Sequence, residues 1–488
     1  MKACWRRDTS GGPTDRSRVA KPQESIHAAS RFQPRRIFTV SCRSATQPLA
    51  AGPPLYAVRC THPAKIVVAI LFSLFASSAL ACPFCTPLGA PLAERREGAA
   101  VAGLAELVSI ADAPAGSGDK IARLKLRHLA KGTAPFAVDS ELELPATQLA
   151  IARDAKPGSL WLLFGTDQGD DEADDLKSRD LPAAVAALEW SAEAANETVY
   201  GYFVRVPGLR TPAAERLRYF ARYLEHADPL VAGDVYNEFG LAPLSVVTEV
   251  ADDLPMAKMR GWLVDAGVPG GRKGFYGVAL GLARDVEQRT ANRALLEALV
   301  DQAVAGDAGA APLPGSDFRA GFDGVLGGLL LIAKIDGLGR IESQLLANPK
   351  AAEGDVRHAV AALRFAHEFV PSIPRDRLAA ALVRVLPRPG FAATAIVDLA
   401  RWQAWECTDD VFRCYRPLRD TKGDAGAAAV RRAVVGYLQN APPLIGMPGL
   451  NALKSNDPQG FSAAQQELGA GAGGALPGAG FSPAVDKD

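Results

Sequence analysis

The 488-residue sequence has no excess of either charge, since 54 Lys and Arg residues balance 54 Asp and Glu residues. It holds only seven cysteines and six histidines, and it contains no GxSxG element, no dinucleotide-binding glycine pattern and no paired-carboxylate signature. Nucleic-acid binding requires a basic face, and catalytic centres of the common classes carry such motifs. We therefore expect no nucleic-acid partner, no cofactor and no metal, and we favour a protein without enzymatic activity.

The sequence also lacks an apolar run of comfortable membrane-spanning length. Its most apolar segment, residues 66–81, is uncharged and has serine as its only polar residue type, whereas a spanning helix needs about 20 apolar residues. The basic flank at Lys65 and the small-residue ending Ala-Leu-Ala are typical of a secretory signal peptide cleaved before Cys82. We predict a signal peptide over residues 65–81, export to the periplasm or the cell exterior, and no transmembrane span after cleavage.

Residues 1–64 are rich in Arg, Ser and Pro and show no sustained apolar periodicity. Such a composition does not build a hydrophobic core. We interpret this segment as disordered, or as a mis-assigned extension of a signal peptide that starts near residue 55 or 58; an organelle transit peptide is the alternative. With residues 1–81 removed, the chain carries 42 basic and 51 acidic residues and becomes mildly acidic.

Four cysteines follow the predicted cleavage site, as the close pairs Cys82/Cys85 and Cys407/Cys414. An even number of cysteines in an oxidising compartment favours disulfides, so Cys82 and Cys85 are expected to form a disulfide or a redox pair, with a lipid anchor on Cys82 as an alternative. A helix between Cys407 and Cys414 would rise about 10 Å, which is too far for a disulfide. We expect a turn at residues 408–410 and a local bridge; two free buried thiols are the alternative.

Strand-like patterns dominate residues 82–207. Residues 120–129 alternate between apolar and charged side chains, as a half-buried strand does, and the turn-forming residues 112–118 precede them. Further strands are expected over residues 100–110, 140–144, 160–164 and 198–206. Several short strands without crossover-length helices between most of them predict a small antiparallel β-barrel or sandwich.

Residues 82–206 resemble the netrin-like modules related to metalloprotease inhibitors. The resemblance rests on the N-terminal cysteine motif, on a strand ending in Lys131-Gly132, and on the run Gly-Ser-Leu-Trp-Leu-Leu-Phe-Gly at 158–165. It implies an OB-type barrel and an inhibitor that acts through its N-terminal cysteine. Those modules begin Cys-x-Cys, whereas this chain has Cys82-Pro-Phe-Cys85, a start similar to that of uncharacterised exported bacterial proteins.

From residue 208 onward the apolar period becomes that of helices. Pairs of helices joined by short turns are typical of a solenoid, in which each pair covers the apolar face of the next. Four glycines, at 321, 324, 327 and 328, interrupt one helix and predict close approach to a neighbour, because glycine costs about 1 kcal/mol in a helix interior. The predicted helices cover residues 212–226, 230–241, 258–266, 275–286, 291–305, 318–335, 354–369, 375–386, 391–405 and 426–439.

The segment 227–239, Ala-Asp-Pro-Leu-Val-Ala-Gly-Asp-Val-Tyr-Asn-Glu-Phe, resembles a HEAT repeat, and residues 357–363 and 430–435 are similar in style. The resemblance covers about residues 212–440 and implies a HEAT-like α-solenoid that presents a surface to a protein partner. We place the helical-repeat domain at residues 208–445. The Gly/Ala-rich residues 446–488 are of low complexity and are predicted to be disordered.

Other motifs fail on spacing. The acidic run 167–175 does not match a calcium loop, and the glycine-rich run 270–274 lacks the spacing of a phosphate loop. His367-Glu368 begins like a zinc-protease helix, but Pro371 stands where the second histidine belongs. The leading hypothesis is an exported, non-enzymatic binding or scaffolding protein. A cysteine-based inhibitor or thiol-redox protein is the alternative, and a hydrolase with a site assembled from scattered residues is the third hypothesis.

Overall fold

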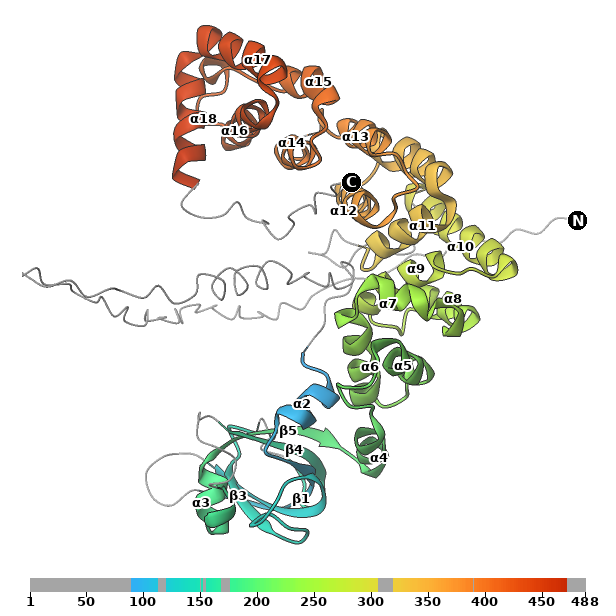
Figure 1. Cartoon of the computed structure of the whole chain (residues 1–488), viewed down its shortest axis with the longest axis vertical. Helices are drawn as coiled ribbons and strands as arrows, with labels where there is room; N and C mark the ends of the chain where they lie inside the picture. The colour runs from blue at the N-terminus through green and yellow to red at the C-terminus, as the bar shows by residue number, and fades with distance from the viewer. Residues whose placement is uncertain are drawn as a thin grey trace, which may run out of the picture. The chain divides into compact units, whose positions relative to one another are not determined.

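A computed structural model of the chain describes residues 89–112, 120–149, 151, 155–167, 176–305, 319–388 and 390–471. The predicted signal peptide, Cys82, Cys85 and most of the acidic run 167–175 lie outside these residues. The described part contains a five-stranded antiparallel sheet followed by many helices (Figure 1). The predicted order of a small antiparallel sheet followed by helices is confirmed at this level.

The sheet has the strand order β3-β2-β1-β4-β5. In β2 the predicted alternation is present, since Leu124 and Leu126 are buried while Arg123 and Arg127 are exposed. No ladder joins the edge strands β3 and β5 within the described residues, so the sheet is open and the predicted barrel is not formed. The strands are β1 (Val101–Asp112), β2 (Lys120–Lys131), β3 (Glu141–Pro145), β4 (Leu160–Asp167) and β5 (Leu188–Ala195).

Both faces of the sheet are covered, because successive side chains of a strand point to opposite sides. On β4, Leu163 belongs to a core formed with β1, β2, β3 and the short helix α3 (Leu181–Ala186). Its neighbours Leu162 and Phe164 belong instead to the core that continues into the helices. The sheet therefore shares one hydrophobic core with the helical part.

The predicted fifth strand at 198–206 is wrong, because this segment forms helix α4 (Glu197–Arg205). The side chain of Asn196 accepts a hydrogen bond from the Val199 amide and so caps the helix. Val199, Tyr202, Phe203 and Val206 are buried and follow the helical spacing i, i+3, i+4, i+7. Alternation of apolar residues was also present, and the cap decides between the two periods. The fifth strand is β5, where no element was predicted.

All ten predicted helices are present with shifted ends, and further helices lie between and after them. The helices are α2 (Leu92–Gly98), α5 (Ala213–Phe220), α6 (Pro229–Leu241), α7 (Leu244–Glu249), α8 (Met256–Val264), α9 (Gly270–Gly281), α10 (Val286–Ala305), α11 (Phe322–Ile341), α12 (Glu353–Phe369), α13 (Arg375–Val383), α14 (Ala392–Arg401), α15 (Thr408–Arg413), α16 (Ala425–Asn440), α17 (Pro443–Asn456) and α18 (Pro458–Gly471).

Helices α17 and α18 correct the prediction of a disordered tail from residue 446 onward. Phe461 and Ala464 of α18 are buried in the common core. Asp457, between the two helices, accepts hydrogen bonds from the Leu418 amide and the Tyr415 hydroxyl. A few apolar residues at helical spacing are enough to dock a Gly/Ala-rich segment when a neighbouring surface is available.

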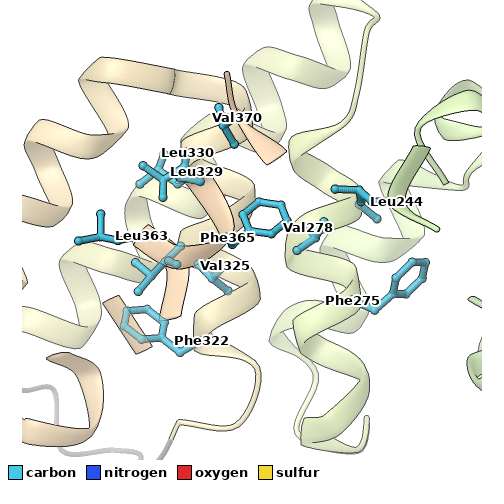
Figure 2. Packing of buried hydrophobic residues seen from close by; sticks show 14 of the residues in the cluster. Leu244, Phe275, Val278, Phe322, Val325, Leu329, Leu330, Leu363, Phe365 and Val370 are labelled. Carbon is cyan, nitrogen blue, oxygen red and sulfur yellow. The ribbon is translucent and has the colours of Figure 1, made fainter. Parts of the chain in front are cut away.

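Most helices pack against helices one or two positions away in chain order, such as α9 with α11, α11 with α12, and α14 with α16. Figure 2 shows one section of the resulting core, where Phe275 and Val278 of α9, Val325 and Leu329 of α11, and Phe365 of α12 lie among the buried side chains. Within the described part of the chain, none of the helices has the length and hydropathy needed to cross a bilayer.

The predicted close approach of the glycine-interrupted helix is confirmed, and its neighbour is α9. A Cβ atom on Gly324 would collide with the carbonyl group of Gly274, and one on Gly277 would lie 2.5 Å from the carbonyl carbon of Gly324. A Cβ on Gly328 would likewise collide with the carbonyl oxygen of Gly277. The two backbones are therefore in direct contact, which only glycine permits at these positions.

We predict that Gly324→Ala destabilises the protein by about 2 kcal/mol, because the added methyl group must push α9 and α11 apart. Gly339→Ala in the same helix is the matched control, since a Cβ at that position meets nothing within 4 Å. The control is expected to raise stability by up to about 1 kcal/mol through helix propensity. Urea unfolding followed by circular dichroism measures both; equal effects of the two variants would show that the backbones are not in contact.

Candidate functional site

A buried carboxylate joins the start of the described chain to the helices. Asp234 on α6 is 4% exposed and accepts hydrogen bonds from the Leu92 amide at 2.6 Å and from the Tyr202 hydroxyl at 2.7 Å. Leu92 is the first residue of α2, where amides have no intrahelical partner, so Asp234 caps that helix from a distant segment. Burial raises the pKa of Asp234, and the two hydrogen bonds oppose this rise.

A second buried carboxylate lies one helical turn further along α6. Glu238 is 6% exposed, and both of its oxygens accept from one Arg216 nitrogen of α5, at 2.5 and 2.6 Å. Burial raises the pKa of Glu238 to about 7, although Arg216 lowers it; the charge of nearby Asp234 adds to the rise. The pair therefore fastens α5 to α6 inside the core.

We call Asp234, Glu238 and the groups that donate to them the polar joint. Helix α2 connects this joint to the sheet. Arg95 forms an ion pair with Glu193 of β5 at 3.0 Å, and its guanidinium lies 4.0 Å from the centroid of the Phe164 ring on β4. Arg96 donates to the carbonyl oxygens of Phe203 and Val206, at 2.7 and 2.9 Å. One short helix thus contacts β4, β5, α4 and α6.

The joint is built to hold elements together. Each of the four carboxylate oxygens of Asp234 and Glu238 already accepts a hydrogen bond from the protein. A general acid or base needs a substrate within hydrogen-bond reach, and these atoms have their protein donors instead. The sequence did carry a signal for the joint, since two acids at i and i+4 stand among the buried residues of α6, but sequence reasoning missed it.

A cluster of three tyrosines lies beside the joint. Tyr202 of α4, Tyr219 of α5 and Tyr223 of the 3₁₀ turn η2 (Ala221–Tyr223) have ring centroids 5.0 to 6.3 Å apart. Arg222 lies with its guanidinium 6.0 Å from the Tyr219 centroid. Tyr219 and Tyr223 are half-buried and Arg222 is exposed. Tyrosine and arginine are the residue types that most often anchor protein interfaces.

The predicted Cys407–Cys414 bridge is wrong, because both cysteines are unbridged. The residues between them form α15 in place of the expected turn, and the Cys414 thiol donates to the Asp410 carbonyl oxygen one helical turn before it. Burial raises the pKa of Cys407 to about 11 and also raises that of Cys414. Both groups are thiols at neutral pH, the less reactive form. The structure gives no placement for Cys82 and Cys85, which precede the described residues.

The histidine-bearing segment of α12 does not assemble a site. Asp355 is buried and forms an ion pair with Arg319 at 3.1 Å, while His358 faces Asp323 at 3.9 Å. Glu368 lies ten residues beyond His358 on the same helix, a rise of about 15 Å. Its carboxyl group therefore does not meet Asp355 and His358. Among the described residues no group of three or more His, Cys, Asp or Glu side chains is arranged to hold a metal ion.

Two shallow surface grooves lie on the helical part. One, of about 360 Å³, lies between α10 and α11, and its charged lining is already ion-paired, as in Arg293–Glu297 at 2.8 Å. The other, of about 500 Å³, lies at the start of α8 and includes Leu254, Pro255 and Met256. Neither lining contains a nucleophile hydrogen-bonded to a base, so neither groove has the arrangement that covalent catalysis requires.

His367 has an environment that disfavours its charged form. Its ring stacks on Trp402 at a centroid distance of 4.5 Å, and its Nε2 atom is buried without a hydrogen-bond partner among the described residues. Burial lowers the pKa of His367 to about 4, from an ordinary value of 6.5, and Arg375 contributes in the same direction.

We predict that Asp234→Asn costs about 2 kcal/mol of stability. Only the oxygen of the new amide group can accept, so either the Leu92 amide or the Tyr202 hydroxyl loses its buried acceptor. The control is Asp252→Asn, which alters an ion pair with Arg284 whose partners are both more than half exposed and should cost about 0.5 kcal/mol or less. Hydrogen exchange at the Leu92 amide gives the specific readout. If its protection survives in Asp234→Ala, which leaves no side-chain oxygen at residue 234 to accept from it, the carboxylate does not cap α2.

A second prediction concerns pH. Between about pH 6.5 and pH 4 the unfolded state takes up a proton at residue 367 that the folded state does not, so His367 lowers stability as pH falls through this window. For a half-exposed ring we expect about 1 kcal/mol. His367→Phe keeps the stack on Trp402 and should lose this contribution relative to the unaltered chain. NMR titration of the imidazole tests the cause directly, and a midpoint near 6.5 would contradict it.

Comparison with protein-family models finds no match to this chain, and no curated protein matches it significantly.

Proposed function

We propose that this chain is an exported, non-enzymatic binding or scaffolding protein that engages a protein partner through a HEAT-like helical surface. The observation that carries the proposal is the packing order, since most helices contact helices one or two positions away. Packing of this kind is what a solenoid requires. It leaves one face of an outer helix such as α10 outward, since the buried side chains described there are confined to Asn292, Leu296, Val300 and Ala303, and such a face suits recognition of an extended partner.

The open sheet supports the same proposal by covering the first helices. Repeat arrays need a terminal cap, because the first repeat otherwise exposes its apolar face. Leu162 and Phe164 of β4 share a core with Val199 and Phe203 of α4, and α2 adds the charged contacts of Arg95 and Arg96. In this proposal the β domain is a capping module for the helical surface.

Export is part of the proposal and rests on the signal-like segment 65–81. Mass spectrometry of the mature N-terminus from the native cell envelope tests it, with a chain that begins at Cys82 as the expected result. The same spectrum reports a lipid adduct, a disulfide or a free thiol at Cys82 and Cys85. A mature chain that retains residues 65–81 would contradict export by cleavage.

The binding function is tested by photo-cross-linking of the tagged full chain in its native envelope, followed by reconstitution with the purified partner. We expect cross-links at residues of the helices from α4 onward, 197–471, and a dissociation constant in the micromolar range or tighter, as a specific interface provides. Cross-linkers at exposed positions of the sheet serve as the control. Failure to reconstitute any cross-linked protein, or a contact confined to the sheet, would overturn the proposal.

A further inference from the structure

One part of the surface combines free guanidinium groups with tyrosine rings. Arg205 at the end of α4 and Arg222 in η2 are exposed, and neither has an ion-pair partner among the described residues. Three arginines on α5 and α9 differ in this respect, because each is held by a carboxylate: Arg216 by Glu238, Arg218 by Asp253 and Arg272 by Glu225.

Both free arginines are near Tyr219 in the fold. The Arg222 guanidinium lies 6.0 Å from the Tyr219 centroid. Burial raises the pKa of Tyr219, and the charges of Arg205 and Arg222 oppose that rise, so both guanidinium groups lie within electrostatic reach of this phenol. The ring of Tyr223 lies 5.2 Å from that of Tyr219. We call Arg205, Tyr219, Arg222 and Tyr223 the arginine–tyrosine patch.

Tyr202 and Asp234 support the arginine–tyrosine patch from the interior of the protein. Tyr202 stacks against Tyr219 at 6.3 Å and meets Tyr223 edge-on at 5.0 Å, and its hydroxyl donates to the buried Asp234. The rings of the patch therefore rest on the polar joint that connects α2, α4 and α6. A surface positioned in advance loses less conformational entropy on binding than a mobile one.

Two carboxylates that follow the patch in the sequence have donors other than Arg205 and Arg222. Glu225 accepts hydrogen bonds from Arg272 at 2.9 Å and from the Tyr276 hydroxyl at 2.5 Å. Asp228 accepts from Asn196 at 3.0 Å and from the Leu230 amide at 3.0 Å. The arginine–tyrosine patch thus presents two guanidinium groups without an ion pair among the described residues, on a chain whose residues 82–488 hold more acidic than basic residues.

We propose that the arginine–tyrosine patch docks an acidic peptide segment of the protein partner. Carboxylates of the segment pair with Arg205 and Arg222, and its backbone lies against Tyr219 and Tyr223. This inference rests on the proposed binding function and assigns it a surface and a partner chemistry. Two free arginines suit a peptide, whereas adsorption to an anionic membrane takes about four to eight basic residues and nucleic-acid binding takes a broad basic face.

The experiment measures fluorescence anisotropy of a labelled Glu-rich peptide with the full chain, beside a Gln-rich peptide of equal length and vesicles containing phosphatidylglycerol. We expect the Glu-rich peptide alone to bind, and to bind less tightly as salt is added. The double variant Arg205→Gln, Arg222→Gln should weaken binding at least tenfold. The matched control, Arg375→Gln with Arg416→Gln, removes two exposed arginines elsewhere on the helices and should leave binding unchanged.

Equal binding of the Glu-rich peptide to the two double variants overturns the inference, as does capture by the vesicles without capture by the peptide. All four arginines are exposed, and circular dichroism confirms that each variant is folded. The reconstituted partner separates the two proposals. A partner that binds the Arg205/Arg222 variant as tightly as the unaltered chain overturns the patch and leaves the binding function standing. Failure to reconstitute a partner overturns the binding function, and the inference with it.

Discussion

The hydrogen bonds to Asp234 are the interaction on which the arrangement of the described chain depends. A carboxylate that is almost fully buried is costly unless donors surround it. Here the donors come from two other elements, the Leu92 amide of α2 and the Tyr202 hydroxyl of α4. The requirement to satisfy one charge on α6 therefore determines where two neighbouring helices lie. Helix α2 then extends the constraint to the sheet through Arg95.

Further along the chain, α9 and α11 are positioned by direct contact of their backbones, whereas α2 and α4 are positioned by hydrogen bonds to a buried carboxylate. Between α9 and α11, glycines at 277, 281, 324 and 328 leave no room for a Cβ atom on either side. Such close packing tolerates little change in volume, so this part of the helical series is held at one separation. The hydrogen-bonded carboxylate of Asp234 and the glycine contact between α9 and α11 differ in chemistry, but each defines how one helix lies against another.

The distribution of polar groups bears on function. Asp234 and Glu238, two buried acids in this region with raised pKa values, already have protein donors, and the cysteines of the helical part are unbridged thiols. Two charges without an ion pair among the described residues, Arg205 and Arg222, are instead on the surface, and Arg222 lies beside Tyr219. Paired groups inside and unpaired groups outside are what the cost of burying polar groups requires of any folded chain, so the function we propose rests on the packing order of the helices.

Local sequence determined much of the fold. The helical period of apolar residues correctly placed all ten helices that it predicted, and the glycines of α11 indicated a close neighbour. Both the period and the glycine spacing are read within one or two helical turns. A local signal also decided residues 198–206, which fit both periods, because the Asn196 cap makes them a helix. Contacts between distant residues decided the rest. Helix α18 is docked because Phe461 has a core to enter. The polar joint follows the same rule. Asp234 is one of two acids in an apolar helix until the fold brings Leu92, 142 positions away, within 2.6 Å.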